Sequence, residues 1–328
     1  MQFPDKATQP TMYFIGVTTG RSSIMKLFPL WARELGLKNA VLKGIDIAIH
    51  APKDDYRQAV SFIKNDPLSL GALVTTHKID LYNATRDLFD FLDPYALVFG
   101  ELSSISKKDG LLTGHAKDPI SSGLAMEVFV PKNFWLDHGG EVFIMGAGGS
   151  ARAMAAYLFH EDQGANIPSK MYIANRSTPR LESMKEIMKR LYPGAPIEYH
   201  HCPDVSINDD ILGRMKPYSL VVNATGLGKD RPGSPLTDQG QFPDNSLVWE
   251  INYRGDLLFM HQALRQKERK NLYVEDGWIY FIHGWTQVVA EVFHTDISGE
   301  RFRRIERISN DFRSSTLDFD GRGLKIVK

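Results

Sequence analysis

Short apolar runs alternate along the chain with segments whose apolar residues recur at helical spacing. The run at residues 12–17 predicts a buried strand, and apolar residues spaced by three and four positions predict a helix over residues 23–35. Pro29 interrupts that helix, which therefore either kinks there or begins at the proline. Strands that alternate with helices indicate an α/β protein with a mainly parallel sheet covered on both faces.

The same alternation predicts the remaining elements. Further strands are expected near residues 40–47, 71–75, 102–113 (two strands around the turn KKDG), 141–145, 171–177, 197, 219–225 and 246–253. Further helices are expected near residues 53–65, 78–95, from 118, from 149, and at 179–191, 207–215, 257–268 and 278–294, with a polar break at WLDHGG. The charged segment after residue 296 predicts a helix in its first part and then a surface extension, either disordered, draped over the domain or in contact with another subunit.

Composition narrows the class of protein. Lys plus Arg and Asp plus Glu number 39 each, so no overall field attracts nucleic acid. No apolar run approaches the roughly 18 residues of a membrane span, and the polar N-terminus lacks a signal core. The single cysteine, Cys202, excludes an internal disulfide and a cysteine-based zinc site. We expect a cytoplasmic protein without a metal, since no HExxH-type spacing occurs.

A glycine-rich turn follows the predicted strand at residues 141–145. Gly146, Gly148 and Ala151 fit the pattern G-x-G-x-x-A at the start of a predicted helix. In this context the first glycine permits a tight turn, the second admits a pyrophosphate, and the alanine allows close packing of the helix. The helix N-terminus offers free N–H groups to phosphates. The pattern indicates a Rossmann dinucleotide-binding domain, although a turn that merely joins strand and helix is the alternative.

The end of the following strand indicates which dinucleotide binds. An NAD enzyme commonly has a carboxylate there for the ribose 2′-hydroxyl. This chain instead has Asn175, Arg176 and Ser177, with Arg180 close by. Guanidinium groups suit a 2′-phosphate, which favours NADP over NAD. The alternative is that both arginines are solvated residues at the start of a helix.

Two loops that follow predicted strands carry candidate catalytic groups. Lys78 ends the segment GALVTTHK, and Asp118 ends the segment GHAKD. Strand ends of parallel sheets face the ligand crevice, so an ammonium and a carboxylate could meet there. Such a pair suits alcohol–carbonyl chemistry, in which a base takes the hydroxyl proton while hydride leaves carbon. Either residue taken alone is more commonly a solvated loop residue.

The order of these motifs resembles the shikimate dehydrogenase family over residues 12–295. The resemblance is carried by GALVTTHK, FGELSSI, GHAKD, GAGGSAR, NRSTPR, VVNATGLG, EINY and DGWIYFIHGWTQ. It implies an N-terminal α/β substrate domain over residues 1–120, rejoined by 278–328, and a Rossmann NADP-binding domain over 121–277, with a cleft between them. It also implies an oxidoreductase acting on CH–OH of a small polyhydroxylated ring, as in aromatic amino acid biosynthesis or quinate metabolism, and a possible homodimer.

The resemblance also assigns roles to individual positions. It makes Lys78 and Asp118 the catalytic pair. The positions implied to bind substrate are Ser22, Ser23, Thr75, Ser103, Ser104, Tyr253 and Gln287. The positions implied to bind the cofactor are Gly146, Ala147, Gly148, Gly149, Ser150, Ala151, Asn175, Arg176, Ser177, Arg180, Asn223, Ala224, Thr225 and Gly277.

Several substrate-side positions depart from the family pattern. Serines stand at positions 103 and 104 in place of an asparagine and a threonine, and Ala116 and Lys117 replace another such pair. We therefore expect the basic side chains of Arg21, His77, His115 and Lys117 to line the pocket. A site that loses a hydrogen-bonding contact discriminates strongly against the ligand that needed it. This favours a quinate-like, cyclitol or hydroxy-acid substrate over shikimate itself.

Two other classes of function compete with an active dehydrogenase. A ligand sensor on the same scaffold would bind a ring acid without turnover, but the retention of Lys78 and Asp118 argues against it. A methylenetetrahydrofolate dehydrogenase would also use a lysine, but its pocket should offer stacking aromatic residues. Near Lys78 the sequence has only Tyr82.

Overall fold

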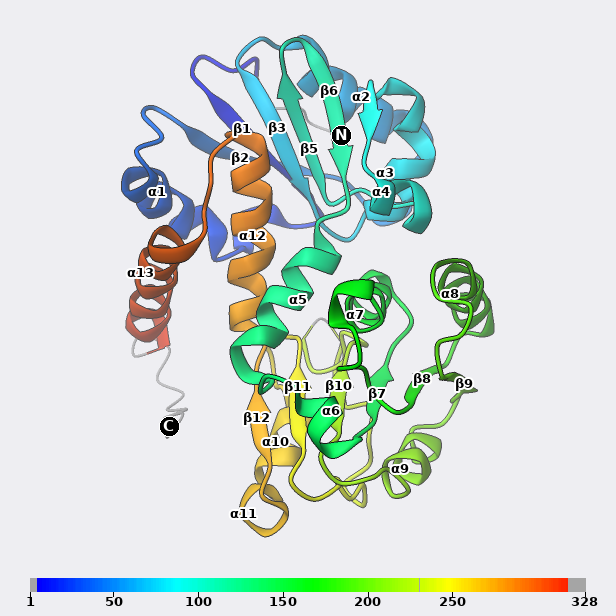
Figure 1. Ribbon diagram of the computed structural model, residues 1–328. Helices are drawn as coiled ribbons and strands as arrows, with labels where there is room; N and C mark the ends of the chain where they lie inside the picture. Colours follow the sequence, from blue (N-terminus) through cyan, green and yellow to red (C-terminus); the bar gives the residue numbers. More distant parts are fainter. Residues whose placement is uncertain (1–4, 230, 318–328) are drawn as a thin grey trace. The chain divides into compact units, whose positions relative to one another are not determined.

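The computed structural model describes residues 5–229 and 231–317 (Figure 1). The chain forms two compact units. The first comprises the residues up to Lys117 together with those from Trp285 on, and the second comprises Asp118–Gly284.

The first unit contains a six-stranded sheet in the order β2-β1-β3-β5-β6-β4. The strands are β1 (Thr11–Gly16), β2 (Val41–Asp46), β3 (Ser69–Val74), β4 (Phe91–Leu92), β5 (Ser104–Lys108) and β6 (Leu111–His115). β1 runs parallel to β2 and β3, whereas β5 runs antiparallel to both β3 and β6. The β5–β6 hairpin turns at Asp109 and Gly110, both with positive φ, as a tight two-residue hairpin requires.

The helices of the first unit are α1 (Ile24–Leu35), α2 (Lys53–Asn65), α3 (Lys78–Thr85), α4 (Pro94–Phe99) and α13 (Gly299–Leu317), with 3-10 turns at Thr19–Arg21 and Arg86–Leu88. α1 begins at Ile24, close to the predicted range of residues 23–35, so the alternative in which the helix starts at Pro29 is wrong. Pro29 lies inside the helix on its exposed side, where its missing N–H removes one backbone hydrogen bond. Leu27, Phe28 and Trp31 bury the opposite face.

α13 packs on α1 within the first unit. The indole nitrogen of Trp31 donates to the Ser309 hydroxyl at 3.1 Å, and Arg304 pairs with Glu34 at 2.7 Å. Ile305 and Ser309 are fully buried. The helix predicted after residue 296 therefore contributes to the core of its own unit. The predicted surface extension beyond residue 317 lies outside the described residues.

The second unit contains a fully parallel six-stranded sheet in the order β12-β11-β10-β7-β8-β9. The strands are β7 (Val142–Met145), β8 (Met171–Asn175), β9 (Ile197–His201), β10 (Leu220–Asn223), β11 (Leu247–Glu250) and β12 (Tyr273–Glu275). The central strands β7, β10 and β11 are buried along their whole length, which explains their continuous apolar sequences.

The helices of the second unit are α5 (Asp118–Phe129), α6 (Phe134–His138), α7 (Gly149–Leu158), α8 (Thr178–Leu191), α9 (Ser206–Leu212), α10 (Leu258–Leu264) and α11 (Lys267–Lys270), with a 3-10 turn at Glu161–Gln163. α6 occupies part of the predicted polar break, because Phe134 and Trp135 are buried. α5 and α7 pack closely, since a Cβ built on Gly123 would lie 2.2 Å from the Tyr157 ring. α12 (Trp278–Val292) contains the boundary between the units.

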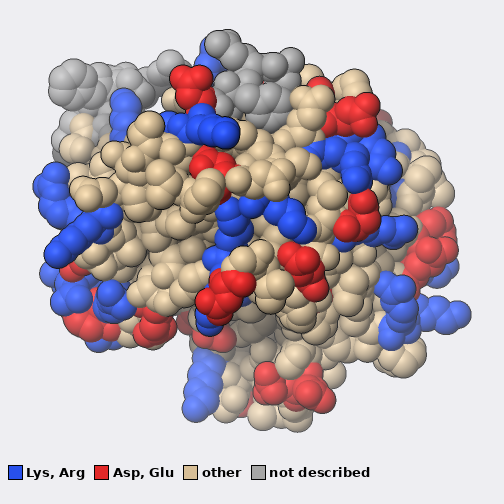
Figure 2. All heavy atoms as spheres, turned by 90° about the horizontal axis from the view of Figure 1, so that it is seen from above, with Lys and Arg blue, Asp and Glu red and all other residues tan. Residues whose placement is uncertain are grey.

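Acidic and basic side chains are interspersed on the molecular face drawn in Figure 2. Among the described residues, no helix combines the length and the apolar character needed to cross a membrane.

Candidate active site

The glycine turn lies at the topological switch point of the second sheet. β7 is flanked by β8 on one side and by β10 on the other, so the chain winds outward from β7 in both directions (Figure 1). The carboxyl ends of β7 and β10 are joined by a hydrogen bond from the Ala224 N–H to the Met145 carbonyl at 2.8 Å. Ligands of open α/β sheets bind outside the strand ends at such a point.

The two glycines of the turn have different structural demands. Gly146 has φ +122°, and a Cβ there would lie 2.5 Å from the Ala224 carbonyl oxygen. Only glycine fits that position. Gly148 has an ordinary φ of −86°, and a Cβ there would meet no atom within 4 Å. The space above Gly148 is therefore open for a phosphate group at the start of α7.

The cofactor-side residues after β8 form a polar turn. The Asn175 side-chain amide donates to the Ser177 carbonyl at 3.2 Å, while Arg176 and Arg180 are exposed to solvent. His201, which ends the neighbouring strand β9, has Nε2 3.1 Å from the Arg176 carbonyl oxygen. His201 was not among the predicted site residues. Its position at the end of β9, which pairs with β8 in parallel, is the signal that could have identified it as a neighbour of Arg176.

The loop after β10 is stabilised by its own polar side chains. The Asn223 Oδ1 atom accepts hydrogen bonds from the Thr225 N–H at 3.1 Å and from the Thr225 hydroxyl at 2.7 Å. Gly226 and Gly228 have positive φ values of 77° and 84°, so the chain turns sharply here. Thr225 is exposed on this loop.

Gly277 and Tyr253, two further predicted site residues, also lie in the second unit. The Gly277 N–H donates to the Asn252 carbonyl at 3.0 Å, and a Cβ on Gly277 would lie only 2.0 Å from the Ile251 carbonyl oxygen. The Tyr253 ring packs against Trp278 and Phe281, with ring centroids 5.4 and 4.7 Å apart. Ser150 of the glycine turn accepts from the Tyr280 hydroxyl at 3.3 Å.

In the first unit, backbone hydrogen bonds gather several predicted site residues at one edge of the sheet. The Leu102 N–H donates to the Lys78 carbonyl at 3.1 Å, and the Val74 N–H donates to the Ser103 carbonyl at 2.9 Å. The Lys117 N–H donates to the Ser103 hydroxyl at 2.7 Å. The ends of β3 and β6 and the start of α3 therefore meet around Ser103.

The turn before Lys78 carries backbone strain. Thr76 has φ +57°, which is unfavourable for a β-branched residue, and the His77 N–H bonds back to the Thr75 carbonyl. Such a conformation costs on the order of 1–3 kcal/mol and persists only where the surroundings enforce it. It lets Lys78 begin α3 directly after the strand.

Lys117 and His115, which are expected to line the pocket, form an ion network with Glu291 of α12. The Lys117 ammonium lies 2.6 Å from Glu291 Oε2, and His115 Nε2 lies 3.3 Å from Glu291 Oε1. The side chains of Lys117 and Glu291 are 15% and 24% exposed. Glu291 lies one helical turn beyond Gln287, and that spacing is the sequence signal that could have identified it.

The surroundings of this network determine the charges of its members. Burial by itself would raise the pKa of Glu291, but the hydrogen bond from Lys117 and the charges of His115 and Lys117 outweigh it and lower that pKa. Burial lowers the pKa of His115, and Lys117 adds to this, against the opposing effects of Glu291 and Asp93. The Glu291 carboxylate therefore compensates the charge of Lys117 within the protein.

His77 does not line an open pocket. Its side chain is 1% exposed, and Nδ1 lies 3.3 Å from the Tyr56 hydroxyl. Burial lowers the pKa of His77, so the neutral ring is favoured. By contrast Arg21, the remaining basic residue expected there, is exposed on the 3-10 turn before α1.

The remaining predicted substrate residues differ in accessibility. Ser22 and Ser23 are half-buried just before α1, and the Ser23 side chain does not cap that helix. Thr75 and Gln287 are half-buried. Ser104 is fully buried, and its hydroxyl finds no hydrogen-bond partner among the described residues.

The predicted catalytic pair is divided between the units. Lys78 begins α3 in the first unit, and Asp118, 8% exposed, begins α5 in the second. Their convergence on one oxygen stays a prediction.

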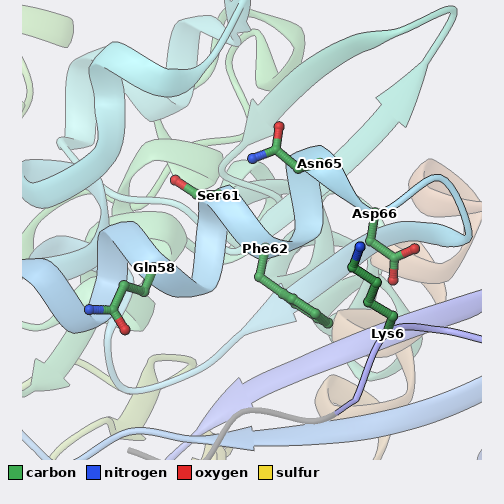
Figure 3. A pocket seen from close by; sticks show the side chains of 6 residues that line it. All are labelled: Lys6, Gln58, Ser61, Phe62, Asn65 and Asp66. Atoms are coloured by element: carbon green, nitrogen blue, oxygen red, sulfur yellow. The ribbon is translucent and has the colours of Figure 1, made fainter.

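A surface hollow of about 380 Å³ lies elsewhere in the first unit, beside α2 (Figure 3). Its lining residues are Lys6, Gln58, Ser61, Phe62, Asn65 and Asp66. The Asp66 carboxylate accepts hydrogen bonds from the N–H groups of Ala7 and Leu68, so it serves the fold. Over the described parts of the chain, no group of three His, Cys, Asp or Glu residues could hold a metal ion.

The fold and the glycine turn define an α/β protein with a dinucleotide-binding type of unit. No protein-family model matches the chain. The shikimate dehydrogenase (NADP(+)) of Nitrosopumilus maritimus is 25% identical over 249 residues, which are 76% of this chain and 81% of that protein. The chain is therefore similar to this shikimate dehydrogenase over about three quarters of its length.

Solved structures show the same fold. The quinate dehydrogenase of Corynebacterium glutamicum in complex with NAD superposes with a TM-score of 0.70 at 19% identity, over 93% of this chain and 99% of that chain. The shikimate 5-dehydrogenase of Thermus thermophilus in complex with NADP(H) and shikimate superposes with a TM-score of 0.65 at 19% identity, over 92% and 99% of the chains.

Proposed function

We propose that the chain is an NADP-dependent oxidoreductase that interconverts a ring alcohol and a ketone on a small polyhydroxylated cyclic substrate. The observation that carries this proposal is the open space above Gly148 at the switch point between β7 and β10. It supports binding of a dinucleotide pyrophosphate at the start of α7. Relatives that are NADP-dependent shikimate dehydrogenases support the same reaction class.

In this proposal the residues after β8 select NADP. Arg176 and Arg180 are exposed and free of a neighbouring carboxylate in the segment NRSTPR, so they can present guanidinium groups to a 2′-phosphate. Gly146, Ala147, Gly148, Gly149, Ser150 and Ala151 would contact the pyrophosphate. Residues 223–225 and Gly277 would border the nicotinamide, which supplies hydride transfer when bound.

The chain's own residues would manage the proton. Lys78 and Asp118 would flank the reacting oxygen and share the proton that leaves or joins the hydroxyl. Thr75, Ser103 and Gln287 would contact ring hydroxyls, with Ser22, Ser23 and Tyr253 completing the pocket. Ala116 and Lys117 stand where the family pattern has an asparagine and a threonine, and Lys117 pairs with Glu291. This departure supports a substrate other than shikimate.

The catalytic role of the lysine is tested by Lys78→Ala. We expect turnover to fall by at least 100-fold with little change in NADP affinity, because a general acid–base contributes about 10²–10⁴ in rate. Lys53→Ala is the matched control, since Lys53 also begins a helix of the first unit but is exposed. Steady-state kinetics that show full activity of Lys78→Ala would remove this lysine from the mechanism.

The cofactor preference is tested by Arg176→Ala. We expect the affinity for NADP to fall at least tenfold while the affinity for NAD stays nearly constant, because only NADP carries the 2′-phosphate. Arg190→Ala, near the other end of α8, is the control. Equal losses for both dinucleotides, measured by fluorescence titration, would contradict the assignment.

The substrate is identified by measuring nicotinamide absorbance with a panel of ring acids and cyclitols, including quinate and shikimate. We expect a ring compound other than shikimate to have the highest kcat/KM. Preferred turnover of shikimate would show that the altered serine, alanine and lysine positions do not redirect specificity.

A cytoplasmic location and a homodimer are also proposed. The lone cysteine, which leaves no internal disulfide, supports the first, and the resemblance to the family supports the second. Cell fractionation and analytical ultracentrifugation test them.

A further inference from the structure

Glu250 is a fully buried carboxylate at the end of β11, two strands from the glycine turn. Its Oε2 atom accepts a hydrogen bond from the Asn223 side-chain amide at 2.7 Å. Its Oε1 atom accepts from the N–H and the side-chain amide of Asn252, at 2.9 and 2.6 Å. Three donors therefore converge on two oxygens, an arrangement that an uncharged amide side chain would not satisfy.

The two asparagines connect Glu250 to the loop after β10. The side-chain amides of Asn223 and Asn252 each lie 3.3 Å from the Leu227 carbonyl oxygen, to which they donate. Asn223 also accepts from the backbone and hydroxyl of Thr225. The conformation of residues 224–228 thus depends on how Glu250 orients both amides.

Asn252 also connects Glu250 to the start of α12. Its carbonyl accepts the Gly277 N–H at 3.0 Å, next to the close approach of Gly277 to Ile251. Gly277 and residues 223–225, which lead into the loop after β10, are the two segments that the proposed function places beside the nicotinamide. Hydrogen bonds through Asn223 and Asn252 therefore connect the buried Glu250 carboxylate to both segments.

Burial of the charged Glu250 carboxylate is unfavourable for the free energy of folding. Burial is the main effect on Glu250 and raises its pKa to about 7, although the hydrogen bonds from Asn252 and Asn223 act in the opposite direction. Among the described residues no cation pairs with it, and the nearby charge of Asp276 raises its pKa further. The position therefore contributes orientation more than net stability.

We propose that Glu250 is a positioning residue for the cofactor, which orients Asn223 and Asn252 and thereby sets the position of the nicotinamide ring. The proposal rests on the proposed NADP-dependent function. It assigns no direct contact with substrate or cofactor to Glu250.

Glu141 offers a matched control in the same unit. It is 4% exposed and immediately precedes β7, at the amino ends of the strands of the same sheet, whereas Glu250 lies at their carboxyl ends. Its carboxylate accepts from the Lys216 N–H at 3.1 Å and from the Tyr172 hydroxyl at 3.4 Å. Glu141→Gln therefore makes the same chemical change in a buried site away from the switch point.

The experiment compares Glu250→Gln and Glu141→Gln in the full chain. We expect Glu250→Gln to lower kcat at least tenfold and to diminish the fluorescence change of NADPH on binding. Its affinity for adenosine 2′,5′-bisphosphate, which lacks nicotinamide, should change less than threefold. Glu141→Gln should alter thermal stability but neither kinetic readout. Asn252→Ser, which removes the amide contacts but keeps the carboxylate, should reproduce the kinetic effect if Glu250→Gln does not fold.

The outcomes separate the two proposals. Unchanged kcat and NADPH fluorescence in Glu250→Gln, or in Asn252→Ser should Glu250→Gln not fold, would overturn the positioning role alone. Equal loss of NADPH and adenosine 2′,5′-bisphosphate binding would also overturn it, because the effect would then be general. If the wild-type protein fails to bind NADPH, the proposed function falls and this inference falls with it.

Discussion

Glu250 is fully buried and the Glu291 side chain is 24% exposed, and the pKa values of the two carboxylates shift in opposite directions. Glu291 has Lys117 and His115 beside it, and its pKa is lowered. Glu250 has only amide donors and the nearby Asp276, and its pKa is raised. The difference follows from the presence or absence of a neighbouring cation. Sequence patterns identified Lys117 as basic, but they could not show which carboxylate compensates it.

The raised pKa of Glu250 predicts a pH dependence of stability. In the folded protein burial raises the pKa of Glu250 to about 7, above the ordinary glutamate value of 4.5. Between these values the folded state binds more protons than the unfolded state, so this group makes the free energy of unfolding decrease as pH rises from about 5 to 8. The contribution is at most about 3 kcal/mol.

Urea denaturation of wild type and Glu250→Gln at pH 5.5 and 8 measures this effect. We expect the stability advantage of wild type over Glu250→Gln to be greater at pH 5.5 than at pH 8. A constant difference across this range would show that Glu250 keeps an ordinary pKa in the folded protein.

At the scale of elements, the two glycines of the turn after β7 have different surroundings. Gly146 is needed because a side chain would collide with the Ala224 carbonyl. Gly148 borders open space and has an ordinary backbone conformation. The sequence pattern identified both glycines and predicted the strand and helix around them, because such turns are local. The register of the neighbouring strand β10 came only from the structure.

These two glycines predict different mutant phenotypes. Gly146→Ala should destabilise the second unit by several kcal/mol, because it introduces both an unfavourable φ and a collision. Gly148→Ala should leave stability within about 1 kcal/mol but weaken NADP binding at least tenfold, since the methyl group would occupy the space needed by the pyrophosphate.

Thermal unfolding and NADPH titration of both variants separate the effects. Unchanged NADPH affinity in Gly148→Ala would show that the pyrophosphate does not approach this residue. Native stability of Gly146→Ala would contradict the packing of the turn against the loop after β10.

At the scale of the whole molecule, the chain leaves its first unit at residue 117 and returns to it at residue 285. The first unit therefore combines an N-terminal and a C-terminal segment of the chain, whereas the second unit is one continuous segment. α13 belongs to the first unit through Trp31, Glu34 and its own buried Ile305. The charged segment after residue 296 predicted a helix here, but its partner α1 lies nearly 280 residues earlier (the Trp31–Ser309 separation is 278).

Deletion of residues 299–328 should destabilise the first unit selectively, because it exposes Trp31 and the apolar face of α1. In scanning calorimetry, we expect one transition to shift to lower temperature. Adenosine 2′,5′-bisphosphate should still stabilise the other, since ligand binding raises the stability of the unit that binds it.

Ser309→Ala is the control for this deletion. It removes only the hydrogen bond to Trp31 and should cost about 1 kcal/mol. If the deletion variant loses the ligand-stabilised transition instead, α13 supports the second unit and the assignment is wrong.

The sequence by itself determined the alternation of strands and helices, the mainly parallel sheet and the glycine turn, because these depend on local backbone preferences and on apolar periodicity. It did not determine that Lys117 pairs with Glu291, 174 positions away, or that Glu250 binds Asn223, 27 positions away. The tertiary structure decided these contacts, since the partner of a buried charge depends on which distant segments pack together. It also decided that α1 begins before Pro29, because the buried face of that helix outweighs one lost hydrogen bond.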